Sequence, residues 1–135
     1  MSPLVWREKM LTSLKVMVFI IGGLFLLIGI AGMFSPEDFA NGLGLNLVNV
    51  EGAGSIRAMI GAHYVAMGGV CFFAVIRQKP ILLFPIATIE VVMVIARGIA
   101  AVNGEFGPSS LVSTSIEVLA AVILIIAALR LPNSE

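Results

Sequence analysis

The chain has 135 residues, of which 59% are hydrophobic and 12% are charged. A soluble domain carries about twice that charged fraction. Lys and Arg together number 8, Asp and Glu together number 8, and the formal net charge is zero. Such a chain has no basic face to bind nucleic acid and too much apolar surface for an ordinary soluble domain. The composition therefore indicates an integral membrane protein.

Four long apolar stretches follow one another along the chain, with only short connections between them. At about 1.5 Å per helical residue, each stretch can cross the roughly 30 Å hydrocarbon core of a bilayer. We expect an all-α membrane protein, a single domain over residues 1–135 that folds as a four-transmembrane-helix bundle with up-down-up-down connections. The expected spans are residues 16–34, 56–76, 81–102 and 111–130.

Two short helices are expected at the membrane surfaces, near residues 3–9 and 36–41. Each begins with a proline that follows a serine, a pattern typical of a helix start. In the second of these helices, Phe39 is expected to face the membrane. Residues 41–55 are rich in Gly and Asn, and this composition predicts a turn-rich connection into the second span.

The Lys and Arg residues that flank the spans all fall on one side of the membrane if there are four spans. The basic ones precede the first span, lie between the second and third, or follow the fourth: Arg7, Lys9, Lys15, Arg77, Lys79 and Arg130. The two remaining loops carry acidic residues and no Lys or Arg: Glu37, Asp38, Glu51 and Glu105. Because short basic loops stay in the cytoplasm, this segregation predicts that both termini are cytoplasmic.

Small residues recur at helical spacing in the first two spans: Gly22, Gly29, Gly32, Ala58, Ala62 and Ala66. Such residues let helix backbones approach closely inside a membrane. They are expected to pack within the bundle, with a homo-oligomer interface as the alternative.

Three charged residues, Glu90, Arg97 and Glu117, lie deeper in the expected spans than Arg57 and Arg130, which stand at span ends. A charge near the centre of a span costs roughly 2.5–3.5 kcal/mol on insertion scales if it is unpaired. Glu90 and Arg97 are seven residues apart in the third span and so return to nearly the same helix face. Glu117 lies at a depth similar to that of Arg97 in the fourth span. We expect Arg97 and Glu117 to form a direct ion pair, with Arg57 close enough to share the carboxylate.

The polar and charged residues that are expected to point inward predict a polar pocket in the outer half of the bundle, with an apolar floor. Three interpretations are open: buried charges that fix helix register, a ligand site, or a proton or ion path. The predicted lining residues are Arg57, Tyr64, Glu90, Arg97 and Glu117.

No sequence motif points to chemistry of another kind. His63 is the single histidine and Cys71 the single cysteine, so no metal-ligand spacing exists and no metal or cofactor is expected. We expect His63 to be hydrogen-bonded within the bundle and Cys71 to be a small buried apolar residue. No catalytic residues are assigned, although Glu90 with Tyr64 would be the acid–base pair of an enzyme.

Several short motifs stand in the last three spans and the loops that border them. Their residues are Arg57, Ala58, Gly61, Gly68, Arg97, Gly98, Asn103, Gly104 and Glu117. This pattern, over roughly residues 16–130, resembles a family of small bacterial four-helix membrane proteins catalogued as a domain of unknown function, similar in layout to the DoxX-like proteins. The resemblance implies a multi-pass protein of the bacterial inner membrane, with Arg57, Arg97 and Glu117 as family positions and no assigned reaction.

The sequence favours a small membrane bundle that binds a small or lipid-like molecule in the outer-half pocket. Arg57 and Arg97 would recognise an acidic or polar head, and Glu117 would orient them. The alternative is an accessory or assembly subunit of a larger membrane complex, with buried charges that are architectural. The expected partners are membrane lipid, a small-molecule or lipid ligand, and either a second copy or a larger complex.

Overall fold

The structure is a computed structural model, and it describes residues 3–133. No strand occurs among these residues. The stretch η1 is π-helical, and η2 is a short turn of 3-10 helix. In chain order the elements are α1 (Pro3–Phe34), α2 (Pro36–Gly42), α3 (Val50–Ser55), η1 (Ile56–Gly61), α4 (Ala62–Ile76), η2 (Pro80–Leu82), α5 (Leu83–Val102) and α6 (Pro108–Arg130).

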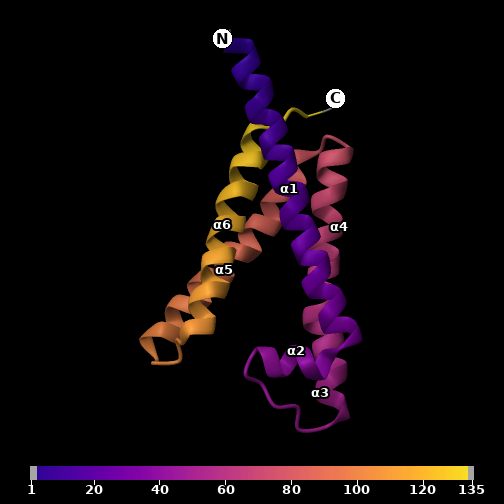
Figure 1. Cartoon of the computed structure of the whole chain (residues 1–135), viewed down its shortest axis with the longest axis vertical. Helices are drawn as coiled ribbons and strands as arrows, with labels where there is room; N and C mark the ends of the chain where they lie inside the picture. The colour runs from indigo at the N-terminus through magenta and orange to yellow at the C-terminus, as the bar shows by residue number, and fades with distance from the viewer. Residues whose placement is uncertain (1–2, 134–135) are drawn as a thin grey trace.

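Four helical segments of the described chain are long and apolar enough to cross a membrane. Large apolar side chains cover their outward faces; Leu27 is 68% exposed, Ile95 57% and Leu119 60%. Because so much exposed apolar surface is unfavourable in water, these faces are suited to contact with lipid. The chain is a multi-pass membrane protein whose long helices run up, down, up and down (Figure 1), which confirms the predicted fold class.

Two helix boundaries differ from the sequence-based expectation. The prediction of a separate short helix near residues 3–9 was wrong, because residues 3–34 form one uninterrupted helix. No Gly or Pro occurs between residues 4 and 21, so nothing breaks the helix before the apolar span. The connection into the second span is also shorter than expected. The Asn49 side chain accepts a hydrogen bond from the Gly52 N–H at 3.0 Å and so caps helix α3.

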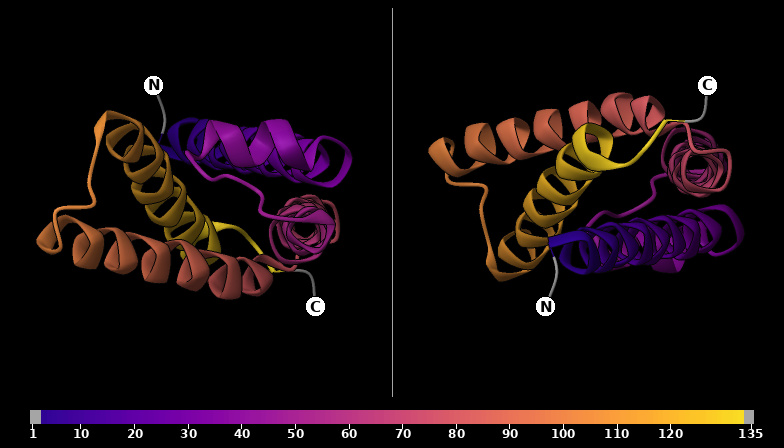
Figure 2. Two further views of the ribbon diagram at one scale, coloured as in Figure 1. Left: turned by 90° about the horizontal axis from the view of Figure 1, so that it is seen from below. Right: turned by 90° about the horizontal axis from the view of Figure 1, so that it is seen from above.

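The long helices associate as two pairs. Helix α1 packs against η1 and α4, and α5 packs against α6. Figures 1 and 2 show that the pairs approach each other at the end that carries both termini and the 77–79 turn, which we call the termini end. They diverge toward the opposite end, which carries residues 35–49 and 103–107 and which we call the loop end.

Glycines bring α1 close to η1 and α4. A Cβ atom on Gly68 would lie 2.6 Å from the Gly22 carbonyl oxygen, and one on Gly29 would lie 2.8 Å from the Gly61 carbonyl oxygen. Both distances are shorter than van der Waals contact, so only glycine fits at these crossings. Gly22 and Gly29 thus meet Gly68 and Gly61 along an antiparallel pair, as expected for small residues in a membrane interface.

The alanines of the second span do not take part in this packing. Ala58, Ala62 and Ala66 are all exposed. Their expected role within the bundle was wrong, because the glycines at positions 61 and 68 approach α1 more closely and place the alanines on the outward face.

The apolar core fills the termini end of the bundle. Phe25 and Val18 from α1, Cys71 from α4, Leu83 from α5 and Leu124 from α6 are almost completely buried there. Alanines beside them, at positions 74, 87, 120 and 127, are also buried and leave room for the larger side chains. The core therefore holds the two helix pairs together at one end only.

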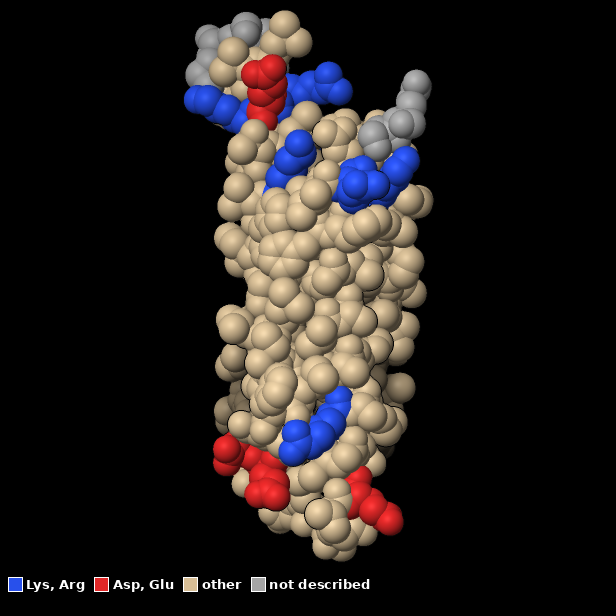
Figure 3. Space-filling model, turned by 90° about the vertical axis from the view of Figure 1, so that its right-hand side faces the viewer, with Lys and Arg blue, Asp and Glu red and all other residues tan. Residues whose placement is uncertain are grey.

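The charged side chains are distributed unevenly between the termini end and the loop end. In Figure 3, blue Lys and Arg side chains gather mainly at the termini end and red Asp and Glu side chains mainly at the loop end, although blue side-chain atoms also lie near the loop end. On this face, a band without charged side chains separates the two ends, as expected for the part that lies within lipid. The arrangement matches the charge segregation seen in the sequence.

Candidate ligand pocket

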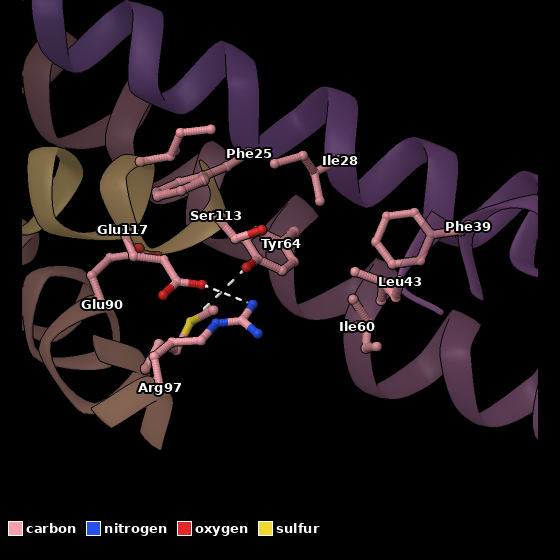
Figure 4. Close-up of a pocket in the computed structure, with 12 residues that line it drawn as sticks. Phe25, Ile28, Phe39, Leu43, Ile60, Tyr64, Glu90, Arg97, Ser113 and Glu117 are labelled. Atoms are coloured by element: carbon pink, nitrogen blue, oxygen red, sulfur yellow. Dashed lines mark hydrogen bonds and ion pairs between the residues drawn. The ribbon is translucent and has the colours of Figure 1, made fainter. Parts of the chain in front are cut away.

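A pocket of about 380 Å³ lies toward the loop end, between the two helix pairs. Six elements contribute to its wall, so the pocket depends on the divergence of the pairs and on α2, which turns back from the end of α1 (Figures 1 and 4). The lining residues are Phe25, Ile28, Phe39, Leu43, Ile60, Tyr64, Glu90, Met93, Arg97, Ser113, Ile116 and Glu117.

The charged part of the wall comes from α5 and α6. Arg97 Nη2 lies 3.3 Å from Glu117 Oε1, within ion-pair and hydrogen-bond distance. The Glu117 side chain is 7% exposed and that of Arg97 is 33% exposed, so the carboxylate is buried while the guanidinium borders the pocket. The direct ion pair predicted from the sequence is confirmed, and Figure 4 shows it as a dashed line.

Two carboxyl oxygens beside this pair have no hydrogen-bond partner. Glu90 is 1% exposed and Glu117 is 5% exposed, and in the described chain neither Glu90 Oε1 nor Glu117 Oε2 receives a hydrogen bond. A buried polar atom without a partner costs about 1–3 kcal/mol, and more when the group is charged. Both residues line the pocket, so a molecule that entered it with hydrogen-bond donors would remove this cost.

Tyr64 bridges the two helix pairs across the pocket. Its hydroxyl donates to Met93 Sδ on α5 at 3.9 Å, and its ring centroid lies 5.7 Å from that of Phe25 on α1. A thioether sulfur is a weak acceptor, so this hydroxyl can exchange its partner for a better one at little cost. Ser113 on α6, which also lines the pocket, donates to the Ser109 carbonyl at 3.1 Å, and its hydroxyl oxygen can still accept a hydrogen bond.

Arg57 lies outside the pocket, and its expected position beside Glu117 was wrong. Its guanidinium donates through Nη1 to the backbone carbonyl of Met33 in the last turn of α1. The expectation assumed regular α-helical rotation from Arg57 to Tyr64, but Arg57 itself belongs to the π-helical stretch η1, which continues to Gly61. Because a π-helical turn closes on i→i+5 hydrogen bonds and holds more residues, it rotates Arg57 away from the pocket.

Residues 13–128 match the family described as "Domain of unknown function (DUF4345)". The chain belongs to the DUF4345 family. The match spans every residue that lines the pocket, so the pocket is part of the DUF4345 domain and not of a terminal extension. No curated protein and no solved structure matches the chain.

The apolar wall of the DUF4345 pocket was largely missed from the sequence. Phe39 and Leu43, at α2 and its end, point into the pocket in Figure 4, whereas Phe39 was expected to face the membrane. Pro36 begins α2 directly after α1 ends, and the chain turns α2 back over the gap between the pairs. The half-buried state of Phe39 follows from this turn, which periodicity within seven residues does not reveal.

The single cysteine and the single histidine of this DUF4345 protein lie in different environments. Cys71 is a free thiol, completely buried in the core, as predicted. His63 is exposed on α4, and its ring meets the edge of the Tyr64 ring at 6.2 Å between centroids. Its expected burial within the bundle was therefore wrong.

Proposed function

We propose that this protein binds a small amphiphilic molecule in the pocket between its two helix pairs. It would do so in the bacterial cytoplasmic membrane, with both termini in the cytoplasm and the loop end outside. The orientation rests on the basic residues of the termini end, since short basic loops remain cytoplasmic. The bacterial setting rests on the family resemblance.

One observation carries the proposal: two residues that line a pocket of about 380 Å³, Glu90 and Glu117, each have a buried carboxyl oxygen with no hydrogen-bond partner in the described chain. A purely architectural set of charges would be expected to satisfy its own hydrogen bonds, because an unsatisfied buried group is destabilising. The volume lies within the roughly 300–1,000 Å³ of small-molecule sites.

The rest of the wall supports an amphiphile over a fully polar ligand. Phe25, Ile28, Ile60 and Ile116 form an apolar surface beside the polar cluster of Glu90, Arg97 and Glu117. A polar head at the cluster would let a hydrocarbon portion cover the apolar side chains and exclude water from them.

The test compares two neighbouring substitutions on α1. Ile28 lines the pocket, whereas Leu27 is 68% exposed on the outward face. Ile28→Trp should fill the pocket, and Leu27→Trp should leave it open. Native mass spectrometry of gently extracted protein should show a bound molecule in the wild type and in Leu27→Trp but not in Ile28→Trp. Absence of any adduct from the wild type, with lipid present, would refute ligand binding.

A second candidate function is that of a subunit in a larger membrane assembly. The outward face of η1 and α4 carries Ala58, Ala62 and Ala66 together with the exposed imidazole of His63. Small residues and a polar side chain favour contact with another helix over contact with lipid. In the same native spectra, Ala62→Phe should release a bound protein subunit, and Ala96→Phe on the exposed face of α5 should not.

A further inference from the structure

The pocket has more acidic than basic groups. Of the titratable side chains that line it, Glu90 and Glu117 are carboxylic acids, Arg97 is the one base, and Tyr64 is a phenol. Arg97 pairs with Glu117, so Glu90 has no basic counterpart among the lining residues. In a site with little water, an uncompensated carboxylate is costly, and a positive charge from a ligand would compensate it.

The unsatisfied atoms are acceptors. An ionised carboxylate accepts hydrogen bonds and donates none. In the ionised form of each residue, Glu90 Oε1 and Glu117 Oε2 both require a donor, and Arg97 already directs Nη2 to the other oxygen of Glu117. An acidic ligand head would add a third negative charge beside these oxygens and leave both without donors. From the sequence, Arg57 and Arg97 were expected to recognise an acidic or polar head. The pairing of Arg97 with Glu117 disfavours an acidic head.

We propose, on the basis of the ligand-binding function above, that the ligand head is a protonated amine seated between Glu90 and Glu117. A primary ammonium group supplies one positive charge and three N–H donors, so it can serve both free oxygens at once. The rings of Phe25 and Tyr64, 5.7 Å apart, border the same space and add favourable contact with a cation. A hydrocarbon chain attached to the amine would lie against the apolar wall.

The test uses ligands that share a decyl chain and differ in the head: decylamine, decanol, decyltrimethylammonium and decanoate. Binding to the full chain in maltoside micelles is measured by native mass spectrometry and by the rise in Tm. Decylamine should bind roughly tenfold more tightly than decanol, equivalent to about 1.4 kcal/mol. Decyltrimethylammonium, which has the charge but no N–H donor, should bind less tightly than decylamine, and decanoate should bind least.

A substitution assigns the preference to Glu90. Glu90→Gln keeps the size of the side chain, removes its negative charge and adds N–H donors, so the advantage of decylamine over decanol should fall by roughly tenfold. Glu51→Gln is the matched control, because Glu51 is exposed on α3 and does not line the pocket. It should retain the wild-type preference.

These outcomes distinguish a failure of the amine proposal from a failure of the ligand-binding proposal. If decanol binds as tightly as decylamine, and Ile28→Trp abolishes both, the amine head is refuted while the pocket function stands. If no decyl compound binds, both proposals fail. Equal binding of decyltrimethylammonium refutes the role of the N–H donors.

The origin of the amine can be read from the same spectra. Nanodiscs that contain phosphatidylethanolamine or phosphatidylcholine differ in the donor groups of the lipid head. Retention of phosphatidylethanolamine alone identifies an aminolipid as the ligand. Retention of neither lipid, with tight binding of decylamine, identifies a free amine.

Discussion

Arg97 and Glu117 come from two helices joined by a short loop, and their distances from that loop differ by about one helical turn. Either residue left alone would keep a charged group in a water-poor site, whereas removal of both leaves no charge unpaired. We expect Arg97→Leu and Glu117→Leu each to lower the Tm in detergent, and the double substitution to be more stable than the sum of the single effects predicts. The coupling should be roughly 0.5–3 kcal/mol, the range for residues in contact.

A distant acidic residue provides the control for this double-mutant cycle. Glu105 lies in the loop between α5 and α6 and is exposed. Arg97→Leu combined with Glu105→Gln should give additive changes in Tm, because the two groups do not pair in the described structure. Additivity of the Arg97 and Glu117 substitutions themselves would contradict the ion pair.

Arg57 is expected to stabilise the helices without contributing to ligand affinity. Its guanidinium donates to the Met33 carbonyl, one of the last carbonyls of α1 that have no partner within the helix. Arg57→Leu should therefore lower the Tm by an amount corresponding to roughly 1 kcal/mol or more, the typical value of one hydrogen bond. Affinity for decylamine should stay at the wild-type value. A large loss of affinity would place Arg57 in the ligand site after all.

At the scale of the helices, the glycine contacts between α1 and α4 should be the positions most sensitive to added volume. A Cβ on Gly68 would lie 2.6 Å from the Gly22 carbonyl oxygen and 3.0 Å from the Leu26 amide nitrogen. Because these are backbone atoms, they cannot move aside unless the two helices separate. Gly68→Ala should destabilise the protein by roughly 1–3 kcal/mol, the usual cost of overpacking, and thermal unfolding in detergent measures this.

The next residue in the same helix is the matched control. A Cβ on Gly69 meets no atom within 4 Å. Gly69→Ala should leave the Tm unchanged or raise it slightly, since alanine is the better helix former. Equal destabilisation by both substitutions would show that helix propensity, and not the contact with α1, determines the effect.

Over the whole molecule, Lys and Arg side chains predominate at the termini end and Asp and Glu side chains at the loop end (Figure 3). Because basic segments stay in the cytoplasm, a reporter fused after the last residue should be active on the cytoplasmic side. An epitope tag inserted between α2 and α3, at residues 44–48, should be reached by antibody from the periplasm in cells with a permeabilised outer membrane. A tag reached only after lysis of the inner membrane would reverse the proposed orientation.

The sequence by itself determined the membrane class, the number of long helices and the Arg97–Glu117 pair. Length and hydropathy are local properties, so an apolar stretch long enough to cross a bilayer is recognisable without any tertiary contact. The ion pair was predictable because both side chains lie on regular α-helices that a short loop joins, so counting residues from that loop gives their depth.

Three features became known only from the tertiary structure: which helices pair, which face of α4 points outward and which residues complete the apolar wall of the pocket. The Ala58-Ala62-Ala66 spacing looked as suitable for packing as the glycines, but only Gly61 and Gly68 admit the α1 backbone. The π-helical stretch moved Arg57 to the end of α1, and α2 brought Phe39 over the gap between the pairs. These features depend on contacts between segments far apart in the chain and on a departure from α-helical rotation, and neither is visible in residue spacing because spacing assumes one regular helix at a time.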